Sequence, residues 1–77
     1  DNVSPGAIIP ARELLGELLL ELKQYDEALK ELEISLMRAP NRHNGLYLAA
    51  QAAKLAGDQF KANRFEEQYK QLISANP

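Results

Sequence analysis

The chain has 77 residues, a formal net charge of −2 and no cysteine. This length allows one small domain, and the absence of Cys excludes disulfides and thiolate metal sites as sources of its stability. With 9 basic and 11 acidic residues, there is no excess of positive charge to attract a phosphate backbone, so we expect no nucleic-acid partner. No apolar run approaches the ~20 residues that span a bilayer, so we expect no membrane insertion. The sequence indicates no cellular compartment.

Residues 1–9 contain Pro5-Gly6, a turn signal, followed by a short apolar run, and we expect an extended arm there. Pro10 suits the first position of a helix because its missing N–H would be unpaired in that place, so the first helix is predicted over 10–23. On a helical wheel five leucines share one arc, which predicts their burial: Leu14, Leu15, Leu18, Leu19 and Leu22. Three glutamates fall opposite and are expected in solvent: Glu13, Glu17 and Glu21.

A second helix is predicted over 26–39. Gln24-Tyr25 forms the turn before it, Asp26 is a candidate N-cap, and Pro40 ends the helix near Arg38 or Ala39. Apolar residues then recur at helical spacing: Ala28, Leu29, Leu32 and Leu36.

The third and fourth helices are predicted over 42–56 and 59–74. Asn41 is the candidate cap of the third helix, Gly57 supplies a left-handed residue at its end, and Asp58 caps the fourth. The inward side of the third helix consists mainly of alanines, which predicts a close approach to its neighbours: Leu48, Ala49, Ala52, Ala53 and Ala56.

Four helices joined by short turns, with no alternating segment that indicates a strand, predict an all-α fold of antiparallel helical hairpins. Small residues recur in these helices at a constant separation, which relates Gly16 to Ala50 and Ala28 to Ala62. This separation, the repeat offset, is about 34 residues, the length of a helical-hairpin repeat. It predicts two stacked hairpins, about 9–42 and 43–76, within one unit over 10–77. Six residues are expected to serve packing: Leu15, Gly16, Ala28, Pro40, Ala50 and Ala62.

These residues resemble the tetratricopeptide repeat, whose pattern is W-x-x-L-G-x-x-Y, then A-x-x-x-F, then P. In the first repeat those places hold Arg12, Leu15, Gly16, Leu19, Ala28, Leu32 and Pro40. In the second repeat Leu46, Ala49, Ala50, Ala53 and Ala62 fit, whereas Glu66 stands where an aromatic residue belongs and Ser74 where proline belongs. The chain is similar to the C-terminal repeat pair of longer bacterial proteins of unassigned function. The alternative is an unrelated four-helix bundle with a crowded core.

The resemblance implies a groove that binds a protein or peptide, because the first helix of each pair lines the concave surface in that family. The equivalent residues here are Glu13, Glu17, Leu20, Glu21, Asn44, Tyr47, Gln51, Lys54 and Leu55. An apolar side chain among carboxylates suits a peptide with apolar and basic groups. The family's chaperone-tail site needs Lys and Asn where this chain has Glu13 and Glu17, so we expect no binding of a C-terminal carboxylate.

No set of residues indicates catalysis, a cofactor or a metal. The chain offers no Cys and one histidine, His43, which we expect to be solvated and without a role. Metal sites in helical bundles pair Glu with His at i, i+3, and the glutamates of the first helix have no such His. A non-enzymatic protein is therefore expected.

The fourth helix offers a second candidate surface with four apolar residues: Phe65, Tyr69, Leu72 and Ile73. Repeat arrays bury such faces only against a neighbour, so a partner or a second copy is expected to cover them. Two hypotheses follow. The chain is an interaction module with a peptide groove, or it is the structural end of a longer array that mediates self-association or stabilises adjacent repeats. We also expect the chain to form a dimer, through helix four or through Val3, Ile8 and Ile9 of the arm.

Overall fold

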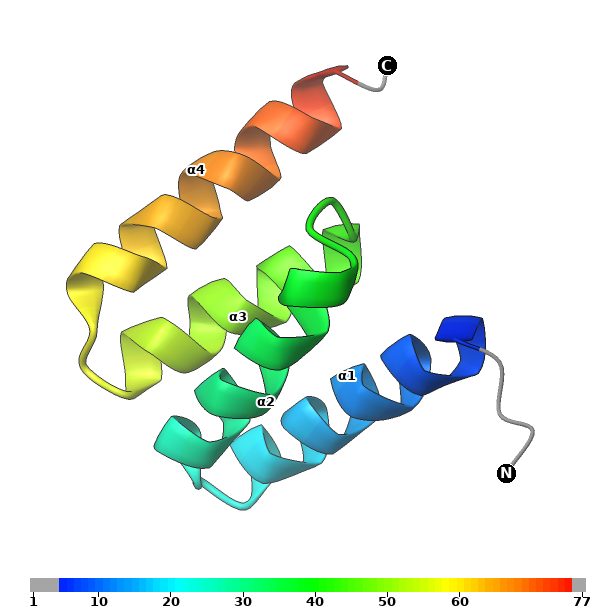
Figure 1. The fold of residues 1–77 in the computed structure, drawn as a ribbon. Helices are drawn as coiled ribbons and strands as arrows, with labels where there is room; N and C mark the ends of the chain where they lie inside the picture. The colour runs from blue at the N-terminus through cyan, green and yellow to red at the C-terminus, as the bar shows by residue number, and fades with distance from the viewer. Residues whose placement is uncertain (1–4, 76–77) are drawn as a thin grey trace.

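The computed structural model describes residues 5–75, and the described chain consists of four helices and their turns (Figure 1). The helices are α1 (Pro5–Glu21), α2 (Tyr25–Arg38), α3 (His43–Leu55) and α4 (Gln59–Ala75). They form a first hairpin, α1 and α2, and a second hairpin, α3 and α4, with α1 and α4 on opposite sides of the array. The predicted all-α class is confirmed.

The first helix begins earlier than predicted. Pro5 occupies its first position, and Pro10 lies inside it, so the expectation of an extended arm is wrong for residues 5–9. Pro5 has the same advantage at a helix start that Pro10 would have had. Pro10 lies in the second turn, so its missing N–H costs the hydrogen bond to the carbonyl of Gly6. Val3 and the side chain of Ile8 lie outside the described residues.

Each hairpin is closed by the same turn. The N–H of Gln24 donates to the carbonyl of Leu19 at 2.9 Å around Lys23, which has a left-handed φ of 63°. In the second hairpin the N–H of Asp58 donates to the carbonyl of Ala53 at 2.8 Å around Gly57, with a φ of 87°. Both have the Schellman geometry in which a left-handed residue ends a helix. The predicted left-handed Gly57 is confirmed, whereas α1 ends before the predicted Lys23 because Lys23 itself forms the turn.

The helix starts differ from the predicted caps in two of three cases. Gln24 is the N-cap of α2 without a side-chain bond, because the preceding turn leads directly into the helix, and Asp26 lies in its first turn. Arg42, not Asn41, is the N-cap of α3, since a turn from Ala39 to Arg42 comes first. Asp58 is the predicted cap of α4: its Oδ1 accepts the N–H of Lys61 at 3.0 Å.

The core lies where α2 and α3 meet their neighbours, and it depends on small side chains. Ala28, Ala49, Ala52 and Ala53 have no exposed surface, and Leu32 fills the space beside them. Gly16 of α1 is buried against Leu32. These residues let the helix backbones approach closely, which a row of leucines would prevent.

The side of α1 that faces the core is the opposite of the predicted one. Glu13 and Gly16 are buried and Leu19 and Leu20 are half-buried, because Gly16 determines the side on which α2 can approach. Four of the five leucines predicted to be buried are exposed: Leu14, Leu15, Leu18 and Leu22. Six residues were expected to serve packing. Gly16, Ala28 and Ala62 are buried as expected, and Ala50 is half-buried. Leu15 and Pro40 are exposed.

The two hairpins use different chemistry at equivalent places. Arg12 of α1 forms an ion pair with Glu31 of α2 at 3.0 Å. The repeat offset leads from these two residues to Leu46 and Phe65 of the second hairpin, which belong to the core. A partly exposed ion pair contributes little to stability, whereas two buried apolar side chains contribute through their area. The second hairpin is the better packed of the two at this point.

Candidate functional site

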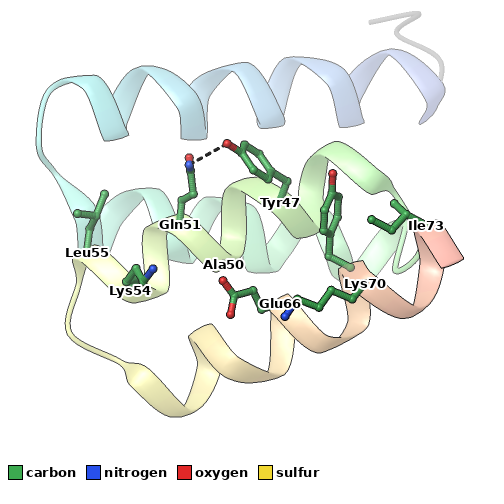
Figure 2. A pocket seen from close by; sticks show the side chains of 9 residues that line it. Tyr47, Ala50, Gln51, Lys54, Leu55, Glu66, Lys70 and Ile73 are labelled. Carbon is green, nitrogen blue, oxygen red and sulfur yellow. Dashed lines mark hydrogen bonds between the residues drawn. The ribbon is translucent and has the colours of Figure 1, made fainter.

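An open groove of about 550 Å³ lies between α3 and α4 (Figure 2). This α3/α4 groove is lined from α3 by Tyr47, Ala50, Gln51, Lys54 and Leu55, and from α4 by Glu66, Tyr69, Lys70 and Ile73. The lining residues recur at spacings of three and four along each helix, so that each helix contributes one continuous face.

Two tyrosines form the aromatic end of the groove. The rings of Tyr47 and Tyr69 are tilted by 49° with their centroids 5.8 Å apart, a favourable geometry for an aromatic pair. Gln51 lies one turn after Tyr47 and donates its amide N–H to the Tyr47 hydroxyl at 3.0 Å (Figure 2). Ala50 lies between these two residues and leaves room above the helix. The aromatic end therefore consists of two paired rings beside the small side chain of Ala50.

Charged side chains surround the apolar part of the groove. Lys54 comes from α3, whereas Lys70 and Glu66 lie one turn apart on α4, and all three are exposed. Two ammonium groups and one carboxylate give the rim a small positive excess at neutral pH. Such a surface favours a ligand with an apolar ridge and acidic flanks.

The α3/α4 groove combines residues that the sequence assigned to two different surfaces. Tyr47, Gln51, Lys54 and Leu55 were expected in a groove with α1, and the structure places them opposite α4 instead. From α4, Tyr69 and Ile73 of the predicted association surface line the same groove. Sequence reasoning missed Glu66, Lys70 and the lining role of Ala50. Their signal was present, since 66, 69, 70 and 73 form one helical face.

The acidic groove predicted between α1 and α3 is not formed as expected. Glu13 is 3% exposed, so it belongs to the interior, and Glu17 and Glu21 are exposed but do not line the α3/α4 groove. Leu20 is half-buried against the core. Asn44 lines a shallow hollow with His43, Tyr47 and Tyr69 and donates to the buried carboxylate. The predicted groove is absent because Gly16 directs the side of α1 that carries Glu13 toward the core.

The buried carboxylate of Glu13 connects α1 to the start of α3. Arg42 donates to both of its oxygens, from Nε to Oε2 and from Nη2 to Oε1 at 3.1 Å, and Asn44 donates to Oε1 at 3.0 Å. Burial alone raises the pKa of Glu13, but the hydrogen bonds from Arg42 and Asn44 and the charge of Arg42 outweigh it and hold the pKa below its ordinary value. Glu13 is therefore a structural residue. Its interaction with Arg42 and Asn44 was not predicted from the sequence.

The predicted association surface of helix four is only partly available. Phe65 is 8% exposed and belongs to the core, and Leu72 is half-buried against it. Tyr69 is half-buried in the groove wall, and Ile73 is exposed. The helix buries Phe65 because the alanines of α3 leave space for one large ring. Phe65 therefore belongs to the core and does not line the α3/α4 groove.

Comparison with protein-family models, with curated proteins and with solved structures found no match to this chain. Within residues 5–75, none of the helices has both the length and the apolar character needed to cross a membrane. In the same part of the chain, no three His, Asp or Glu side chains are grouped in a way that could hold a metal ion.

Proposed function

We propose that this chain is a non-enzymatic protein-interaction module that binds a partner helix in the α3/α4 groove. The observation that supports this proposal most directly is the way in which α3 packs on the first hairpin. It contacts both α1 and α2 and lies against the face formed by the two helices. The second hairpin presents the equivalent face, and the α3/α4 groove is that face.

The equivalence follows residue by residue. A Cβ on Gly45 of α3 would lie 3.0 Å from Leu36 and 3.2 Å from Glu13, so α3 closely approaches the first hairpin there. The repeat offset relates Leu36 to Lys70 and Glu13 to Tyr47, and both Lys70 and Tyr47 line the α3/α4 groove. The groove therefore has the location at which a helix docks on a hairpin of this shape.

The lining indicates the chemistry of the partner. Tyr47, Tyr69 and Ile73 offer apolar surface, and Ala50 leaves depth for an inserted side chain. A helix with apolar side chains at i, i+3, i+4 and i+7 would bury them here and leave its polar face in solvent. The resemblance of residues 9–76 to tetratricopeptide repeats supports the proposal, because proteins of that family bind other proteins.

A display library of amphipathic helical peptides tests the proposal. Peptides selected on the full chain would be measured against Ala50→Arg, which blocks the floor of the groove, and Ile73→Arg, which places a charge in its wall. Both variants are expected to weaken binding by at least about tenfold, the loss typical of a contact at the centre of an interface. Melting curves of each variant would establish that the fold is retained.

Met37→Arg is the matched control, because Met37 is exposed on α2 and does not line the α3/α4 groove. It introduces the same charge as Ile73→Arg and is expected to bind the selected peptides as the unmodified chain does. A library that yields no binder, or binders that are insensitive to both groove variants, would contradict the proposal.

A further inference from the structure

The outer side of α1 presents a leucine face that nothing in the described chain covers. Leu14 is 55% exposed, Leu15 43%, Leu18 47% and Leu22 66%, and the exposed Ala11 lies one turn before them. These five residues, the leucine face, follow the i, i+3, i+4, i+7, i+11 spacing of one helix side. A contiguous apolar surface of this kind marks a site of association.

The same positions of α3 are buried. By the repeat offset, the leucine face corresponds to Gly45, Leu48, Ala49, Ala52 and Ala56. The first four of these residues are buried and Ala56 is half-buried, on a helix that packs on the first hairpin. The leucine face of α1 therefore occupies positions that the equivalent helix α3 buries, and one of these, Gly45, contacts the first hairpin.

The two surfaces belong to different hairpins. The leucine face lies on α1 of the first hairpin and the α3/α4 groove on the second. Helices α1 and α4 lie on opposite sides of the array (Figure 1). Where α3 approaches the first hairpin with the small Gly45, α1 offers the small residue Ala11 at the equivalent position. Ala11 would then lie beside the flexible stem of Lys70, which can move to accept it.

The charges of the two surfaces are also complementary. The exposed Glu17 and Glu21 lie beside the leucines on α1, whereas Lys54 and Lys70 lie on the rim of the α3/α4 groove. Opposite charges around an apolar contact steer association and determine its orientation. Both apolar fit and charge therefore select α1 of a second copy as the occupant of the groove.

We propose that copies of this chain associate head to tail, with the leucine face of one copy in the α3/α4 groove of the next. This inference rests on the proposed function and names the partner of the same groove. Because the two surfaces differ, each added copy leaves one of each surface uncovered. Association is then open-ended and does not stop at a symmetric dimer.

Sedimentation of single and mixed variants tests this arrangement. Leu22→Glu places a charge in the leucine face and leaves the groove intact, whereas Ala50→Arg blocks the groove and leaves the leucine face intact. The unmodified chain is expected to increase in average mass with concentration, and each variant alone to lose at least about tenfold in association constant. An equimolar mixture of the two variants is expected to form a complex of one copy of each and to grow no further.

Met37→Glu is the matched control for Leu22→Glu, since it adds the same charge outside both surfaces and is expected to associate like the unmodified chain. A symmetric dimer retained by either variant alone, with no mixed complex, would overturn the head-to-tail arrangement. The head-to-tail arrangement would also be overturned if the unmodified chain stays monomeric over a range of about a hundredfold in concentration. If such a monomer still binds library peptides in the groove, the proposed function stands and the second copy is not the partner. If it binds none, both fail.

Discussion

Gly16 and Leu32 are in such close contact that a Cβ on Gly16 would lie 2.7 Å from Cγ and Cδ2 of Leu32. Leu32 has no exposed surface, so its side chain has no free space into which to move. This contact holds α1 against α2. It also determines which side of α1 faces the core and which side carries the exposed leucines.

Gly16→Ala is expected to destabilise the chain although alanine is the better helix former. The gain in helix propensity is about 1 kcal/mol, and overpacking a buried contact costs about 1 to 3 kcal/mol. We expect a net loss of up to about 2 kcal/mol in the free energy of unfolding, measured by urea denaturation. Leu32→Val shortens the side chain that the new Cβ would meet, so the double variant is expected to lose less stability than the sum of the two single losses. Losses that simply add would contradict the contact.

The two hairpin turns predict opposite effects of substitutions at equivalent positions. Lys23 has a left-handed φ, which is unfavourable for a residue with a Cβ, so Lys23→Gly is expected to raise the free energy of unfolding by about 0.5 to 1 kcal/mol. Gly57→Ala forces a Cβ into the same conformation and is expected to lower it by about 1 kcal/mol. Thermal melts of both variants would check this, and changes of the same sign would be inconsistent with the shared turn geometry.

The Glu13 carboxylate predicts a loss of stability in acid. Its pKa is lowered in the folded chain, so folding favours the ionised form. The resulting stabilisation is present above the unfolded pKa of about 4.3 and is lost as the pH falls through the lower folded pKa. Melting temperatures of the unmodified chain and of Glu13→Gln should therefore differ most near neutral pH and converge in acid. A difference that does not change with pH would argue against the role of the charged carboxylate.

Phe65 and Ile73 separate the fold from the groove. Phe65→Ala removes a buried ring and is expected to cost about 3 to 5 kcal/mol, a large part of the stability of a chain of this size. Ile73→Ala truncates an exposed residue of the groove wall and is expected to cost less than about 1 kcal/mol. Urea unfolding would compare them, and similar losses for the two variants would contradict the placement of Phe65 in the core.

The fold class was predictable from the sequence because helix signals are local. Pro40 cannot continue a helix, Gly57 permits a left-handed φ, and Asp58 accepts a backbone N–H, and the helices end or begin beside these residues. The start of α1 was not predictable, because Pro5 and Pro10 are equally suited to a first turn and the residues around them do not separate the two.

The side of α1 that faces the core was not predictable from its apolar pattern alone, so the predicted groove along α1 was misplaced. Five of its leucines share one arc of the helical wheel and only Leu20 lies on the other side, so the wheel favours the larger apolar arc as the inward side. The decisive residue was Gly16, since only its side allows α2 to approach, and that side includes Glu13.

Tyr47 and Gln51 were predicted as groove residues, but their neighbours on α4 depended on packing between distant segments.

Amide chemical shifts of the full chain, recorded as a library-selected helical peptide is added, test the location of binding most directly. In the Leu22→Glu variant, whose α1 does not compete for the groove of another copy, binding in the α3/α4 groove predicts the largest shifts at Tyr47, Ala50 and Ile73, with those of Glu17 and Glu21 unchanged. The largest shifts at Glu17 and Glu21, with the groove residues unaffected, would contradict the central claim.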